Sequence, residues 1–467
     1  MSSSPAGNAG ERPAPVLDAV VVGGGIAGLA AAWHLRDRDV LVLEQADRLG
    51  GRIRSEPRGP YWLNLGAHVF GGHGTATGRL VEEIGLDLAP VPGHLVAIEL
   101  NGRIVVGGRP ELYPFRLPLS LRERLALIRA GARLKLAVSR YERIACPREG
   151  ESAADTRRRI LAYGDDRTFA DWLGPVPGDA AALFRATVTR STAELEEITF
   201  GHGAGYFALV WSAGKGLSHN IVGGAGRLID SIGGALRDRI RLGADVRSVD
   251  TDGDLVRVRW VQDSAESEVV ARHVVVATKA FDAARIVVSL PPETRRALDA
   301  IPYGPTVVMA ILTGETGPMP WDDLYALATP KRSFSMLFNI VNVLRPRSEE
   351  REPGGSLMVY RSGHAALDMF EQPDDEVAQS FLDDLYAIYP ESRGIVQETI
   401  LLKLPRMLPY AAPGRGSLQL ALDRSLGRIH LAGDYLGGVY TETAIASGED
   451  AAREIRAAIE GGGGTSP

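Results

Sequence analysis

Residues 18–55 decide the fold of this chain and read DAVVVGGGIAGLAAAWHLRDRDVLVLEQADRLGGRIRS. An apolar run typical of a buried strand (19–22) leads into a glycine-rich turn and then into an alanine-rich helical segment (29–36). A second apolar run (40–43) ends at Glu44. This order predicts two parallel strands joined by a helix.

The turn after the first strand has the G-x-G-x-x-G spacing of dinucleotide-binding proteins. Gly23 allows the tight turn, Gly25 lets a pyrophosphate approach the backbone, and Gly28 lets the helix pack closely on the strand. Glu44, about 20 residues further on, is placed to accept hydrogen bonds from a ribose diol. The free N–H groups at the start of the helix favour an anion. The predicted phosphate site is completed by the first helical residues, Ile26 and Ala27.

Residues 45–52, QADRLGGR, resemble the E-x-x-x-R-x-G-G-R extension of the flavoprotein amine-oxidase superfamily. That superfamily includes monoamine and polyamine oxidases, protoporphyrinogen oxidases and carotenoid-type desaturases. The resemblance implies that the cofactor is FAD, bound in part by Gln45, Arg48 and Gly51. Arg52 is expected to neutralise the diphosphate.

A second motif stands near the C-terminus, where residues 428–455 read RIHLAGDYLGGVYTETAIASGEDAAREI. They resemble the strand, A-G-[DE] step and Y-x-E-x-A-x-x-S-G helix of the same superfamily. The resemblance implies that Gly433 and Asp434 approach the diphosphate–ribityl part of FAD. The helix beginning near Thr443 is expected to stabilise the anionic reduced flavin through its dipole. The cofactor residues expected at this helix start are Glu442, Thr443 and Ala444.

Two more segments resemble parts of the flavin site. Residues 65–68, LGAH, match a motif whose glycine packs against the flavin ring, with Asn64 where the superfamily has an acid. Val246 is expected to contact the adenine, and Lys279 follows the strand 273–278 where the superfamily usually has a proline. The first of these segments adds Gly66, Ala67 and His68 to the expected cofactor residues. His68 is explained equally well as a structural histidine between domains whose hydrogen bonds are satisfied.

The resemblance implies an α/β fold: a Rossmann-like FAD-binding domain of the GR2 type, and a second, substrate-binding domain of mixed β-sheet plus helices. The FAD-binding domain is expected to be discontinuous, with the segments 16–95, 220–286 and 404–460. The substrate-binding domain is expected to comprise 96–219 and 287–403. Disordered tails are expected at 1–15 and 461–467.

Composition narrows the function. A net charge of −6 and a pI near 5.9 give no attraction to nucleic acid. Cys146 is the single cysteine, which excludes disulfides, a metal-binding cysteine cluster and a flavin attached to a cysteine near the C-terminus. No metal site is expected, and a cytoplasmic location fits this cysteine usage. Arginine dominates the 52 basic residues, so single arginines are discounted as functional signals.

The segment 116–143 is basic and contains an expected helix, 119–141, with Ser120 as its cap. It is compatible with peripheral contact to an anionic membrane, although a solvated helix face is the more common explanation of such a pattern. The polar segment 151–167 is expected to be a loop, and residues 95–106 are expected to form a hairpin with Asn101 and Gly102 at its turn.

Five side chains are candidates for catalysis, although each alone is more often a structural residue: His68, Lys215, His219, Tyr360 and Tyr440. In many amine oxidases the strand that corresponds to residues 301–308 carries a lysine that holds a water against flavin N5. Val308 stands at that position here, which weakens an amine oxidation of that style.

The expected function is therefore an FAD-dependent oxidase or desaturase similar to protoporphyrinogen oxidase. It would pass a hydride from a C–H of a small or cyclic metabolite to flavin N5, with molecular oxygen as the default acceptor. Two alternatives remain open. One is an amine oxidase with a different water holder, and the other is a non-redox flavin enzyme of the UDP-galactopyranose mutase type.

Overall fold

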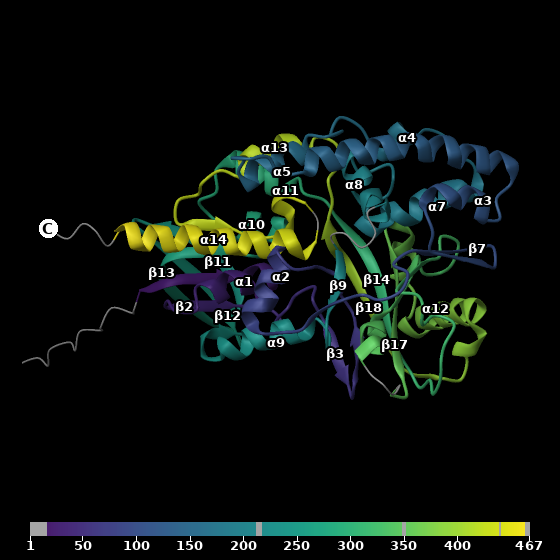
Figure 1. The fold of residues 1–467 in the computed structure, drawn as a ribbon. Coiled ribbons are helices and arrows are strands. Elements are labelled where there is room, and N and C mark those ends of the chain that lie inside the picture. The colour runs from purple at the N-terminus through teal and green to yellow at the C-terminus, as the bar shows by residue number, and fades with distance from the viewer. Residues whose placement is uncertain (1–15, 212–216, 348–351, 439, 463–467) are drawn as a thin grey trace, which may run out of the picture.

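A computed structural model describes residues 16–211, 217–347, 352–438 and 440–462. Its described strands form two large sheets with helices around them (Figure 1). The sheet around β1, together with α1 and α14, makes up one half of the molecule. The sheet that contains β14, β17 and β18 makes up the other half, and α4 runs along the edge of that second half.

The first sheet has the strand order β10–β2–β1–β13–β12–β11, with β19 beside β13. β10, β2, β1, β13 and β19 are parallel, whereas β11 and β12 pair antiparallel with each other and with β13. The strands are β1 (Leu17–Val22), β2 (Val40–Leu43), β10 (Ile240–Arg241), β11 (Asp245–Asp252), β12 (Leu255–Gln262), β13 (Ala265–Val276) and β19 (Ile429–Leu431).

Helices cover both faces of this sheet, and the side chains of β1 alternate between the two faces. Ala19 and Val21 pack with one group of helices, and Val20 and Val22 pack with the other. The first group is α1 (Ile26–His34), α2 (Ala76–Ile84), α9 (Gly226–Ala235) and α14 (Thr441–Gly462). The second group is α10 (Ala280–Ile286), α11 (Pro292–Asp299) and α13 (Arg415–Leu422). The predicted β–α–β unit is thus confirmed.

The second sheet has the order β18–β14–β17–β16–β15–β7–β8 and is mixed, since β15 and β7 are parallel. On β14, Val307 and Met309 face α12, whereas Val308 faces the other side. The predicted hairpin at Asn101 and Gly102 is present, with positive φ at both residues. The elements are β7 (Ala97–Leu100), β8 (Arg103–Val106), β14 (Tyr303–Thr313), β15 (Ala326–Ala328), β16 (Met336–Asn339), β17 (Gly355–Ser362), α12 (Asp374–Ile388) and β18 (Val396–Pro409).

Small sheets connect the two halves, and a helical layer covers the second. The small sheets are β3 (Ser55–Arg58) with β4 (Tyr61–Asn64), and β5 (Phe70–Gly71) and β6 (Leu88–Pro90) on either side of β9 (Leu217–Ile221). The layer is α3 (Tyr113–Arg116), α4 (Leu121–Ala145), α5 (Ala153–Leu161), α6 (Phe169–Leu173), α7 (Gly178–Val188) and α8 (Phe200–Trp211). Its core is aromatic, with Phe169 stacked on Phe207 at 5.5 Å between ring centroids.

Two expectations for this layer had different outcomes. Helix α4 is confirmed, and Ser120 forms a capping box with Glu123. The loop expected at 151–167 is wrong, because this segment contains α5, whose cap Ser152 accepts a hydrogen bond from the Asp155 N–H. The expected domain boundaries stay a prediction.

Candidate active site

A cavity of about 520 Å³ lies between the first sheet, the start of α14 and the second sheet. It runs from β11 past the glycine-rich turn to β14 and β17. Most of the residues expected to bind FAD line it: Gly23, Gly25, Ile26, Ala27, Glu44, Gln45, Gly51, Arg52, Gly66, Ala67, His68, Val246, Gly433, Asp434 and Ala444. Tertiary structure therefore brings together the two terminal motifs and the segments between them.

The start of α1 has the properties of a phosphate cradle. Gly25 is the N-cap and provides no side-chain cap, so the first N–H groups of the helix are free for an anion. A Cβ added to Gly25 would meet nothing within 4 Å, whereas one added to Gly28 would lie 2.0 Å from the Gly23 carbonyl oxygen. Gly25 therefore leaves space in the cavity, and Gly28 keeps the helix close to the strand, as the motif predicts.

The Glu44 carboxylate lies at the carboxyl end of β2. One oxygen accepts from the Gly24 N–H at 2.5 Å, and the other accepts from the Ala46 N–H at 2.8 Å. These bonds fix the carboxylate beside the glycine-rich turn. Each carboxylate oxygen has a second lone pair, so Glu44 retains acceptor capacity for a ribose diol.

Arg52 and Asp434 form a bidentate ion pair that joins the N-terminal motif to the C-terminal one. The two N–O distances are 2.6 and 2.9 Å, and Asp434 is only 5% exposed. Burial opposes the charge of Arg52, yet Asp434 raises the pKa of this guanidinium above its usual value. The side chain thus neutralises a carboxylate of the protein and lines the expected diphosphate region as well.

Four of the residues expected to bind FAD do not line the cavity. Gly28 is in the helix–strand contact, and Thr443 contacts Gly437. Arg48 donates to the carbonyl oxygens of Leu49 and Gly51 and so supports the loop. Glu442 accepts from the Thr77 N–H at 3.3 Å, at the start of α2, where the helix dipole favours a carboxylate.

His68 is held as a neutral imidazole. Its Nδ1 lies 3.0 Å from the Gly66 carbonyl oxygen, which accepts only, so Nδ1 carries the proton. Burial lowers the pKa of His68 to about 4. Its ring packs edge-on against Phe338 at 4.5 Å. The Nε2 atom is shielded and has no hydrogen-bond partner among the described residues.

The other candidates for catalysis are separated by the fold. Tyr360 on β17 and Tyr440 before α14 line the cavity near His68. Burial raises the pKa of Tyr440 to about 12, so this phenol is protonated at neutral pH. His219 on β9 lines a different cavity, beside Pro90 and His94, and does not join this group. Lys215 lies outside the described residues.

Sequence reasoning missed four cationic residues that line the cavity. Lys279 caps the start of α10, where the superfamily usually has a proline, and Arg406 lies over the Phe281 ring at 4.3 Å. The other two are Arg190 and Arg285. The lysine-for-proline replacement was the only signal for Lys279, and the abundance of arginine in the chain hid the three arginines.

A second cavity, of about 360 Å³, lies between the helical layer and β7, β15 and β16. Its lining is mainly aliphatic and aromatic, and its one described acid, Glu111, is paired with Lys135. The two cavities share three lining residues: Val69, Arg190 and Phe338. The two cavities are therefore adjacent at this junction.

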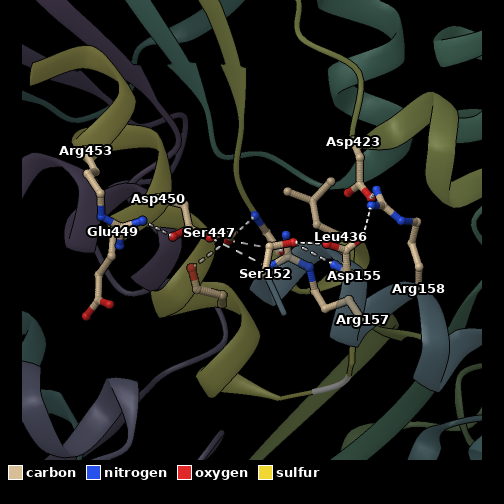
Figure 2. A network of polar contacts seen from close by, with 12 residues as sticks. Ser152, Asp155, Arg157, Arg158, Asp423, Leu436, Ser447, Glu449, Asp450 and Arg453 are labelled. Carbon is tan, nitrogen blue, oxygen red and sulfur yellow. Dashed lines mark hydrogen bonds and ion pairs between the residues drawn. The ribbon is translucent and has the colours of Figure 1, made fainter. Parts of the chain in front are cut away.

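Figure 2 shows how α5 is tied to the elements that carry the C-terminal motif. Arg158 points to Asp423, which follows α13, at 3.0 Å. Arg157 lies 3.7 Å from Asp450 on α14. In the same region the Gly433 N–H donates to Ser447 Oγ on α14 at 2.9 Å. These contacts fix the start of α14 relative to the helical layer.

Known proteins share this fold. A putrescine oxidase bound to putrescine superposes with a TM-score of 0.74 at 19% identity, over 95% of this chain and all of the oxidase. Cyclohexylamine oxidase from Brevibacterium oxydans also gives 0.74, at 20% identity over 96% of this chain and all of the oxidase. At such identities the likeness shows the fold alone.

Sequence comparison is more specific. The AofH protein of Mycobacterium tuberculosis, provisionally named a flavin-containing monoamine oxidase, is 28% identical over 303 residues. These residues cover 62% of this chain and only 60% of AofH. A sequence model described as flavin containing amine oxidoreductase matches residues 26–456, which is most of the chain.

The fold and the lined cavity define an FAD-dependent oxidoreductase. More specifically, the chain belongs to the flavin-containing amine oxidoreductase family. FAD is its cofactor, and the uncapped start of α1, the space at Gly25 and the Glu44 carboxylate fit such a group. In the described part of the chain, no helix has both the length and the apolar character needed to cross a membrane, and no cluster of potential metal ligands was found.

Proposed function

We propose that this chain is an oxidase or desaturase that removes a hydride from a C–H bond of a small or cyclic metabolite, in the manner of protoporphyrinogen oxidase. Molecular oxygen is the default electron acceptor. The observation that carries the proposal is the apolar cavity that meets the cofactor cavity at Val69, Arg190 and Phe338. When bound, FAD supplies the two-electron acceptor chemistry.

The residues of the chain position the substrate and exclude water. Phe338 and Tyr360 stack at 5.7 Å and form one wall near the junction. Val308, which is buried, lines the cofactor cavity opposite Tyr360 in the strand register. An apolar side chain cannot orient a water, so this arrangement favours substrates that need no lysine-held water.

Amine oxidation is the second candidate, and the names of the relatives favour it. Putrescine oxidase, cyclohexylamine oxidase and AofH are all named for amines. Val308 stands against this candidate, since it leaves the position expected for the water-holding lysine apolar. The third candidate, a sugar mutase, requires reduced flavin and consumes no oxygen.

The test is oxygen uptake by the purified, FAD-loaded protein with porphyrinogens, amines and polyenes, with free FAD as the control. We expect hydrogen peroxide to form with a compound that loses two hydrogens and gains a carbon–carbon double bond. Turnover of simple amines alone would overturn the proposal in favour of amine oxidation. The flavin could instead react with no compound in air, while the reduced protein interconverts UDP-galactopyranose and its furanose form. That result would move the assignment to the mutase.

We further infer that α4 contacts an anionic membrane near the mouth of the apolar cavity. Leu121, Leu125, Ile128 and Leu136 share one exposed face of α4 by helical spacing, and Leu136 is 67% exposed. Ile128 also lines the apolar cavity, and so does Phe115 on α3, which is 61% exposed. Arginines flank this apolar face, as expected of a helix that lies on a charged surface: Arg122, Arg129, Arg133 and Arg140.

Replacing Leu121, Leu125 and Leu136 together by serine is expected to weaken binding to vesicles that contain anionic phospholipid by at least about tenfold, because the apolar area available for burial is lost. Vesicle flotation measures this effect. Leu420→Ser is the matched control, since Leu420 is 70% exposed on α13, away from this face. A wild-type protein that does not float with such vesicles at low salt would contradict the inference.

A further inference from the structure

Arg190 lies at the junction of the two cavities and lines both. In the described part of the chain, no carboxylate forms an ion pair with it. Its electrostatic neighbours are instead three phenols, Tyr206, Tyr360 and Tyr440. Burial raises the pKa of each phenol above its usual value, so all three are neutral at physiological pH. The junction therefore carries one uncompensated positive charge.

Carboxylates are available close by in the sequence, but each has another partner. Glu194 pairs with Arg185 and accepts from the His364 N–H at 2.9 Å. Glu196 also lies against Arg185, at 3.3 Å. Glu197 lies 3.1 Å from the His364 ring nitrogen. A charge removed from water normally needs a counter-charge, so the missing partner of Arg190 points to a ligand.

The backbone that carries Arg190 is rigidly held. Ser191 Oγ donates to the Val188 carbonyl oxygen at 2.7 Å and accepts from the Ala193 N–H at 3.2 Å. Thr192 has a φ of 69°, which is unusual for a β-branched residue. A strained residue that is kept in place by its surroundings is common at binding sites. The backbone at Arg190 is thus fixed before a ligand arrives.

We propose that Arg190 binds a carboxylate of the substrate at this junction, so that the substrate is an organic acid with an apolar body. This inference rests on the proposed function, since it names the substrate class of the same site. A guanidinium matches a planar carboxylate through two parallel hydrogen bonds. The neutral phenols of Tyr360 and Tyr440 are further potential donors. A single cation surrounded by neutral groups suits a singly charged anion better than a phosphate dianion.

The same charge discriminates between substrate classes. A protonated simple amine would face Arg190 without a carboxylate to receive its ammonium group, and like charges in a site of low dielectric repel strongly. The apolar cavity would hold the body of the substrate. The carboxylate at Arg190 would then fix which carbon faces the cofactor cavity.

Binding of three simple probes to the FAD-loaded protein tests this proposal without turnover. Benzoate, benzamide and benzylammonium have similar shapes but different charges, and their binding is followed by calorimetry and by changes in the visible flavin spectrum. We expect benzoate to bind at least about tenfold more tightly than either of the others. Its affinity should stay constant from roughly pH 6 to roughly pH 9, since arginine remains protonated throughout.

Variants separate a binding role of Arg190 from a structural one. Arg190→Met should remove the preference for benzoate, Arg190→Lys should restore part of it, and Arg272→Gln, an exposed change on β13, should leave it intact. A wild-type protein that binds benzamide as tightly as benzoate would overturn the proposal even if no variant folded. Because these outcomes are read from binding, failure to find an oxidised substrate would count against the proposed function and not against this inference.

Discussion

Arg52→Met is expected to lower the free energy of unfolding by about 3–5 kcal/mol, because it leaves a buried carboxylate without its counter-charge. Asp434 is 5% exposed and receives two guanidinium hydrogen bonds from Arg52. Denaturant unfolding of the FAD-free protein measures the loss directly. FAD affinity should fall as well, since the same pair fixes the C-terminal motif beside the glycine-rich turn.

The matched control for this variant is Arg48→Met. Arg48 lies in the same motif but bonds only to the carbonyl oxygens of Leu49 and Gly51 and does not line the cavity. We expect it to cost much less stability. The double variant Arg52→Met/Asp434→Leu should recover part of the loss, because it removes the unpaired charge. Equal effects of Arg52→Met and Arg48→Met would show that the ion pair contributes little.

Alanine substitutions at two glycines of one motif should affect different properties, the stability of the protein in one case and its affinity for FAD in the other. Gly28→Ala is expected to destabilise even the FAD-free protein by at least about 1–3 kcal/mol, since its Cβ would lie 2.0 Å from the Gly23 carbonyl oxygen. Gly25→Ala should leave that stability unchanged, because its Cβ would meet no protein atom within 4 Å and its φ of −73° suits alanine. Instead, it should weaken FAD binding by more than about tenfold, because the methyl group would occupy the space that the pyrophosphate needs.

Thermal unfolding of the FAD-free variants and fluorescence titration with FAD separate these two effects. A Gly25→Ala protein that binds FAD as the wild type does would place the pyrophosphate elsewhere. A Gly28→Ala protein of normal stability would mean that α1 can move away from β1 at little cost.

Local patterns were enough to predict the nucleotide-binding half of the chain. The apolar run of β1, the glycine spacing and the acid after β2 are properties of neighbouring residues, and the structure has each of them. The Ser120 cap of α4 and the hairpin turn at Asn101 were predicted for the same reason. Helix α5 was missed because its segment is polar, and its stability comes from its cap and from contacts with α13 and α14.

The sequence by itself determined the β–α–β unit, the family resemblance and the use of FAD, because these follow from spacings within short segments. Only the tertiary structure decided that Arg52 pairs with Asp434, 382 positions away, and that His219 is absent from the cofactor cavity. It also showed that Arg190 lacks an acidic partner within the described chain although three glutamates follow it closely. Charge compensation depends on distances through space, and no spacing along the chain encodes them.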